Sequence, residues 1–278
     1  FLLSFAFIGI FIGLSSSAKA GGMKTIVFAE SHSKNFVAVF ILVLAMIAVA
    51  AGSFKYAERV ISLPYFSRAL ASTDVAGAET SILKALRLNA NDMYLRTSAQ
   101  VYLIKLATLV GKANLTDQEK ASLQTVLDQS VNSGILATAY NPSNYLNYQT
   151  LGAVYQAVAA FGVPGGYDKA IQSYDKAIEL NPLNPGLQLA KARALFAQKK
   201  NKEAKDLASA VLTLKPDYID ALLTLAQISK ANGSNSEALS YAEKALALAP
   251  ANKDIIAYVN SLKSGANPTP PTSDKKTQ

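Results

Sequence analysis

The sequence predicts an all-α protein in which N-terminal transmembrane helices are followed by an α-solenoid of antiparallel helix pairs. Three observations lead to this prediction. An uncharged apolar run of nineteen residues occupies positions 36–54. Beyond it, residues 56–263 carry apolar residues at helical spacing and no strand-like alternation of useful length. Within that part, small residues and prolines recur every 34 residues, which is typical of a chain built from repeated helix pairs.

Residues 1–14, FLLSFAFIGIFIGL, form the first apolar run and are interpreted as a truncated transmembrane helix. A signal peptide is one alternative, because Ala18-Lys19-Ala20 reads as a small-residue cleavage site. A buried or misassigned start is another. The missing basic region in front of the run favours the truncated helix. Residues 15–35, rich in Ser, Gly and Lys, are expected to form a polar loop.

The second apolar run, residues 36–54, is long enough to cross a bilayer. At 1.5 Å per helical residue it spans about 28 Å, close to the hydrocarbon thickness of about 30 Å. Lys34 and Lys55 flank it, where their ammonium groups can reach the lipid headgroups. A buried core helix is the alternative, but such a helix normally keeps a polar stripe, and this run has only Ser53 near its end. The lipid bilayer is therefore an expected partner of residues 36–54.

The strongest internal signal is the 34-residue repeat in the C-terminal half. In each of three copies an alanine lies twelve residues before a proline, and a second small or β-branched residue follows the alanine at helical spacing. A proline after a helix blocks its continuation, and a large side chain at the small positions would force two helices apart. The recurring residues are Ala170, Ala204 and Ala238, then Ala177, Val211 and Ala245, and finally Pro182, Pro216 and Pro250.

This pattern resembles the tetratricopeptide repeat (TPR), a 34-residue pair of antiparallel helices. The first helix of the earliest clear copy, YLNYQTLGAVYQ, matches the family's aromatic-Leu-Gly-Tyr pattern with Tyr148, Leu151, Gly152 and Tyr155. Six residues are inserted between this helix and Ala170, and we expect them to lengthen the turn between the two helices of the copy.

A more degenerate copy lies upstream. Its first helix is expected at about 58–71 and its second at 76–89, followed by a helix over 92–110. Another helix is expected to begin at Thr116, where Thr116 and Glu119 have the spacing of a capping box. The distance to the next Asn-Pro turn exceeds one repeat, so both helices of this pair are expected to be longer than standard.

The end of the chain has two parts. After the last repeat proline, NKDIIAYVNSLK is expected to form a capping helix that closes the repeat domain at residue 263. Residues 264–278 are dominated by Pro, Ser, Thr and Lys and keep no apolar period. A disordered tail is the expectation for them.

The composition excludes several kinds of site. The chain has no cysteine and a single histidine, His32, which is interpreted as a solvated loop residue, so thiolate and multi-histidine metal sites are excluded. The net charge of +8 is dispersed without a basic stripe, so no nucleic-acid partner is expected. No phosphate loop and no nucleophile–base set is present. We therefore predict a chain that is not itself an enzyme, with no catalytic, cofactor-binding or metal-binding residues.

The TPR resemblance implies a groove for a protein or peptide partner, because first helices line the concave face of such a solenoid. The register set by the prolines places a mixed apolar, amide and basic set there: Gln149, Gln156, Leu189, Arg193, Phe196, Leu223, Gln227 and Lys230. One groove known in the family holds a C-terminal carboxylate with Lys and Asn at fixed positions. Gln149, Leu189 and Leu223 stand at the Lys positions here, so that clamp is not supported.

The order of segments also resembles the C-terminal end of bacterial membrane proteins of the O-antigen ligase/polymerase type. In those proteins the last membrane helices are followed by TPRs. This gives two readings besides a membrane-anchored interaction scaffold: the non-catalytic end of such a glycan-processing enzyme, and a structural spacer. Lys and Arg counts on the two flanks of the span tie, and short loops obey the positive-inside rule more strongly than long domains. We therefore expect a cell-membrane protein with its repeats outside the cytoplasm.

Overall fold

The computed structural model describes residues 32–110 and 116–265. The predictions for residues 1–31 and 266–278, which include the first apolar helix, most of the polar loop and most of the tail, lie outside the described residues. The chain divides into two compact units, Phe1–Ala57 and Glu58–Gln278.

The described part of the first unit belongs to helix α2, His32–Ala71. The helix begins inside the segment 15–35 expected to be a loop, and it runs unbroken through the uncharged stretch and the predicted helix over 58–71. Among the described residues, one helical segment, Phe40–Ala71, is long and apolar enough to cross a membrane, judged by length and composition alone. The side chains from 40 to 54 are exposed, so within this chain the run is not a core helix. A membrane span stays a prediction.

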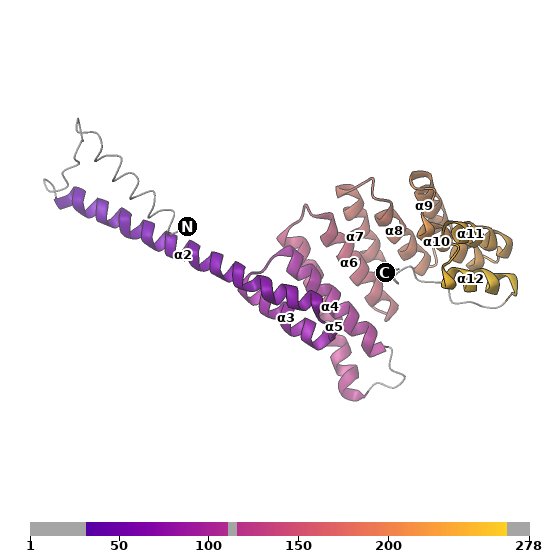
Figure 1. Cartoon of the computed structure of the whole chain (residues 1–278), viewed down its shortest axis with the longest axis horizontal. Coiled ribbons are helices and arrows are strands. Elements are labelled where there is room, and N and C mark those ends of the chain that lie inside the picture. The colour runs from indigo at the N-terminus through magenta and orange to yellow at the C-terminus, as the bar shows by residue number, and fades with distance from the viewer. Residues whose placement is uncertain (1–31, 111–115, 266–278) are drawn as a thin grey trace. The chain divides into compact units, whose positions relative to one another are not determined.

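The second unit is built of helices in succession, and the part of it that the structure describes is all α (Figure 1). Each helix packs against the next one in the chain, and α4, α6, α8 and α10 also contact one another in sequence. The first helices of the pairs thus form one layer and the second helices another, as predicted for a solenoid. The bounds are α3 Val75–Leu88, α4 Asp92–Val110, α5 Asp117–Tyr140, α6 Tyr145–Ala160, α7 Gly166–Leu180, α8 Pro185–Ala197, α9 Asn201–Leu214, α10 Ile219–Ala231, α11 Asn235–Leu248 and α12 Lys253–Lys263.

Polar side chains fix where several of these helices begin. The side chains of Asn144, Asn184 and Asn252 accept hydrogen bonds from the first backbone N–H groups of α6, α8 and α12. Thr116 and Glu119 form the predicted capping box at the start of α5. These contacts satisfy backbone donors that have no partner inside the helix.

The small residues of the repeat lie where the helices touch. All six positions, Ala170, Ala204, Ala238, Ala177, Val211 and Ala245, have no exposed surface. Ala204 and Val211 belong to a cluster that joins α8, α9 and α10, and Ala245 belongs to one that joins α10, α11 and α12. This confirms the repeat register and the capping helix α12.

The six inserted residues do not simply lengthen the turn. Helix α6 has 16 residues, whereas α8 and α10 have 13 each. The turn 161–165 has five residues, whereas 198–200 and 232–234 have three each. Half of the insertion therefore extends α6, because AVAA continues the helix with good helix formers and Gly162 (φ 83°) is the first residue that favours a turn.

The end of α2 and helix α3 occupy the two segments expected for the degenerate upstream copy. The end of α2 packs on α3 and α4 through a cluster around Ala69, Ile82 and Tyr94. The rings of Phe66 and Tyr94 stack at 4.5 Å between centroids, and the hydroxyls of Ser62 and Tyr94 are 3.1 Å apart. Helices α4 and α5 have 19 and 24 residues, which confirms that this pair is longer than standard.

Candidate functional site

The first-helix face, made by α6, α8 and α10, carries most of the predicted groove residues. Arg193 is exposed there, and five others are partly exposed: Gln149, Gln156, Phe196, Gln227 and Lys230. Leu189 and Leu223 are different, with 1% and 3% of their surfaces exposed. They pack in the clusters against α9–α10 and α11–α12, so including them as groove contacts was wrong. An apolar side chain at this register gains more by joining the interhelical core than by facing water.

Arg193 is the best-defined polar group on this face. Its Nε donates a hydrogen bond to Oγ1 of Thr224 on α10, at 3.1 Å. Its Nη2 lies 4.0 Å from a carboxylate oxygen of Asp220, one helical turn earlier on α10. Thr224 in turn donates to the backbone carbonyl of Asp220 at 2.7 Å. The side chain of Arg193 nevertheless stays 44% exposed, so its position is fixed while its guanidinium can still meet a ligand.

A buried tyrosine connects α6 to the surroundings of Arg193. The hydroxyl of Tyr174, on α7, donates to Oε1 of Gln156 at 3.1 Å. Burial raises the pKa of Tyr174 above its usual range, and the charge of Arg193 opposes this rise in part. Gly152 is required here, because a Cβ at this position would lie 2.6 Å from the Tyr174 ring.

Sequence reasoning missed Tyr174, Asp220 and Thr224 as parts of this face. Only 3% of the surface of Tyr174 is exposed, so its ring packs in the core. Only its hydroxyl reaches a polar neighbour. Asp220 and Thr224 lie four residues apart on α10, one repeat after Arg193 on α8. This spacing is a signal from which their contact with Arg193 could have been predicted.

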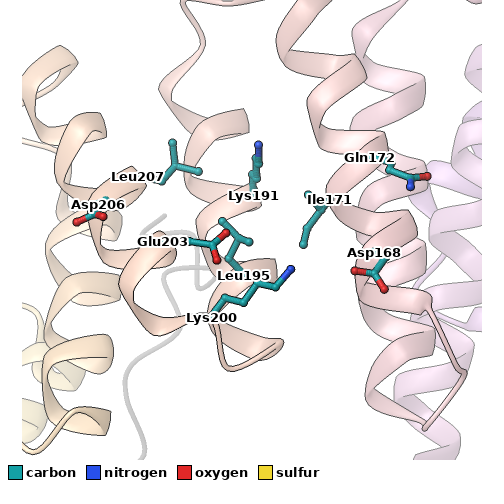
Figure 2. Close-up of a pocket in the computed structure, with 9 residues that line it drawn as sticks. All are labelled: Asp168, Ile171, Gln172, Lys191, Leu195, Lys200, Glu203, Asp206 and Leu207. Carbon is teal, nitrogen blue, oxygen red and sulfur yellow. The ribbon is translucent and has the colours of Figure 1, made fainter.

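A second concave feature lies between α7, α8 and α9 (Figure 2). It is an open groove of about 560 Å³ with an apolar centre formed by Ile171, Leu195 and Leu207. Charged and polar side chains surround that centre: Asp168, Gln172, Lys191, Lys200, Glu203 and Asp206. We call it the α7–α9 groove. It involves second helices and was not predicted.

The chemistry available at both features is that of binding. Within the described residues, no group of three or more His, Cys, Asp or Glu side chains is placed to hold a metal ion. A fixed guanidinium, neighbouring amides and apolar side chains can hydrogen-bond and pack against an extended polypeptide.

Comparison with known proteins identifies repeats of one family in the second part of the chain. Two tetratricopeptide-repeat family models match it, over residues 165–228 and 219–252. A thermophilic TPR protein of known structure from Thermus thermophilus has a TM-score of 0.55 to this chain at 18% identity, covering 76% of this chain and 99% of that one. The chain therefore contains TPRs and has the all-α fold of a TPR solenoid.

A relative of narrower extent is the STIP1 homolog of Dictyostelium discoideum, which is 33% identical over 89 residues. The match covers 32% of this chain and 16% of the length of that protein. The matching models are both TPR models and lie downstream of the apolar run, so they lend no support to the resemblance to a glycan ligase.

Proposed function

We propose that this chain is a membrane-anchored TPR scaffold whose first-helix face binds an extended segment of a partner protein. The TPR scaffold itself rests on the family models and the fold. The observation that carries the binding proposal is the guanidinium of Arg193, which Thr224 and Asp220 hold in place while it stays exposed. A group fixed before binding loses little conformational entropy on binding.

The side chains near Arg193 are of the kinds that bind an extended polypeptide. Gln156 and Gln227 offer amides that can pair with a peptide backbone, and Phe196 offers an apolar surface. Arg193 between them would meet a carboxylate or a backbone carbonyl of the partner. Leu189 and Leu223 are buried, so a basic clamp for a C-terminal carboxylate finds no support at those positions.

Peptides selected from a random phage-displayed library against the full chain in detergent micelles test this proposal. Arg193→Ala is expected to weaken their binding about tenfold, because a charge-assisted hydrogen bond contributes about 1.5–3 kcal/mol. Lys202→Ala, an exposed change on α9, is the control and should leave binding unchanged. Selected peptides that bind both variants as tightly as the parent would show that the site lies elsewhere.

The membrane anchor is supported by the uncharged stretch 36–54 and by the length of the helix that contains it. The full chain is expected in the membrane fraction and should resist extraction with alkaline carbonate. Recovery in the soluble fraction without detergent would contradict the anchor. The repeats are proposed to lie outside the cytoplasm. A cysteine introduced at Ser234, an exposed turn residue, should then react with a membrane-impermeant thiol reagent in intact cells or spheroplasts, and labelling only after lysis would reverse this topology.

A further inference from the structure

The gaps between neighbouring second helices differ: an ion pair bridges one of them, and a groove lies in another. Between α9 and α11, Nζ of Lys205 donates to a carboxylate oxygen of Glu237 at 2.7 Å. The hydrogen bond from Lys205 lowers the pKa of Glu237, and Glu237 raises that of Lys205. Between α7 and α9 the corresponding gap holds the α7–α9 groove.

The repeat register explains the difference. Glu203 lies 34 residues before Glu237, so the two acids occupy equivalent positions on α9 and α11. The residue 34 positions before Lys205 is Ile171. The gap between α7 and α9 therefore contains the acid, Glu203, but has an isoleucine where the next gap has a lysine. Within 32–110 and 116–265, no basic side chain makes an ion pair with Glu203.

The other charges around the groove do not replace that cation. Nζ of Lys191 is held 2.5 Å from a carboxylate oxygen of Asp175 on α7. Asp168 accepts a hydrogen bond from Gln198 at 2.7 Å. Lys200 also lines the groove and makes no ion pair with Glu203 among the described contacts, while Asp206 adds a second acid on α9. Figure 2 shows Glu203 on α9 and Leu195 on α8 among the side chains that line the groove.

We infer that the α7–α9 groove is a second binding site, separate from the first-helix face, for a peptide segment that places a lysine or arginine beside an apolar side chain. The basic group takes the position against Glu203 that Lys205 holds against Glu237 in the next gap. The apolar side chain packs on Ile171 and Leu207. A volume of about 560 Å³ is within the range of ligand pockets and suits a short segment rather than a whole helix. The acids complement a basic segment although the protein as a whole has a net charge of +8.

The probe for this site is an acetylated, amidated, fluorescent hexapeptide of alternating leucine and lysine, titrated into the full chain in detergent micelles. A peptide with glutamate in place of lysine is the control ligand. The lysine peptide is expected to bind, and the glutamate peptide to bind at least about fivefold more weakly, since two partly exposed ion pairs together contribute about 1 kcal/mol. Equal binding of the two peptides would contradict the inference.

Two sets of variants locate the binding. Glu203→Gln combined with Asp206→Asn should weaken the lysine peptide about fivefold, whereas Asp217→Asn combined with Glu243→Gln, which removes two acids elsewhere, should not. Ile171→Lys supplies the missing cation from the protein and should abolish binding while the chain stays folded by circular dichroism. Lys200→Ala removes a competing charge and should strengthen binding.

The reverse change tests the register argument directly. Lys205→Ile removes the cation from the gap between α9 and α11, and it should create a second site for the same peptide next to Glu237. A stoichiometry that rises from one to two peptides per chain is the expected result. An unchanged affinity in the Glu203→Gln, Asp206→Asn variant would overturn the inference, even if Arg193→Ala still weakened binding of the library peptides at the first-helix face.

Discussion

One buried position of the first helices is filled in two different ways along the chain. It lies three residues after the N-cap, and in α8, α10 and α12 it holds Leu187, Ala221 and Ile255, each at most 2% exposed. In α6 the same position holds Asn147, which is also fully buried. The later pairs are thus joined by apolar contact at this point, and the α4–α5–α6 junction by hydrogen bonds.

The hydrogen bonds of Asn147 reach three parts of the chain. Its Oδ1 accepts from Nη1 of Arg96 on α4 at 2.7 Å. Its Nδ2 lies 3.2 Å from a carboxylate oxygen of Asp92 and 3.0 Å from the backbone carbonyls of both Ala137 and Asn141. Apolar contacts tolerate small rotations, whereas hydrogen bonds are directional. The comparison indicates that a polar network fixes the orientation of the long pair α4–α5 relative to α6. In the regular repeats, packing of small side chains holds neighbouring helices together.

The largest expected effect on stability comes from replacing the polar side chain of the α4–α5–α6 junction by an apolar one, as in the later repeats. Asn147→Leu gives α6 the side chain that α8 has, but it removes one hydrogen bond each from Arg96, Asp92 and the backbone carbonyls of Ala137 and Asn141. The free energy of unfolding should fall by roughly 2–4 kcal/mol, because four hydrogen bonds of a fully buried side chain are lost and each contributes about 0.5–1.5 kcal/mol. Gln149→Leu on the same helix is the control for denaturant unfolding. A variant as stable as the parent would mean that the network is dispensable and that packing alone holds both regions.

An intermediate effect is expected in the apolar region. Ala204→Leu and Ala238→Leu each place a large side chain at a helix contact without exposed surface. Each should lower the free energy of unfolding by about 1–3 kcal/mol through overpacking. Lys202→Ala, on the exposed side of α9, should stay within about 0.5 kcal/mol of the parent. Three variants that melt together with the parent would disprove the repeat register.

The smallest expected effect is a pH dependence of stability. It concerns the polar α4–α5–α6 junction, which contains Asp92, and not the apolar contacts of the later repeats. Burial raises the pKa of Asp92, but hydrogen bonds from Asn144, Asn147 and Asn141 and the charge of Arg96 outweigh it, so the pKa lies below 3.8. A carboxyl group with a lowered pKa in the folded state stabilises the protein above its unfolded pKa, about 3.9, and this contribution disappears as the pH falls through the folded value. The difference in melting temperature between the parent and Asp92→Asn should therefore shrink below pH 4. A constant difference from pH 6 to pH 2.5 would exclude the charge of Asp92 as a stabilising factor.

The regular repeats could be predicted from the sequence because their constraints are local and periodic. The small side chains of Ala170, Ala204 and Ala238 and their spacing of 34 residues predict where helices touch. The capping-box residues Thr116 and Glu119 predict the start of α5. The polar junction could not be predicted in this way. Asn147 reads as an ordinary helix residue, and its partners Asp92 and Arg96 lie about fifty residues away without a periodic signal.

The candidate sites were predicted less completely for a related reason. The register places a residue on a helix, but a rotation of a few tens of degrees decides whether it faces the groove or the core. Arg193 stays exposed on the first-helix face, and Leu189, four residues earlier on the same stripe, is buried against α10. The α7–α9 groove was not predicted, because the difference between Ile171 and Lys205 is noticed only when the copies are compared position by position.

The most direct test of the binding proposal is site-specific photo-crosslinking in the cells that express the full chain. A photoreactive phenylalanine analogue at Phe196, beside Arg193 on the first-helix face, should form an adduct with a partner protein. The same analogue at Leu183, which is 81% exposed on the turn between α7 and α8, should not. The adduct at position 196 should disappear when Arg193→Ala is added. Adducts of equal yield at both positions, or an adduct at 196 that survives Arg193→Ala, would contradict it.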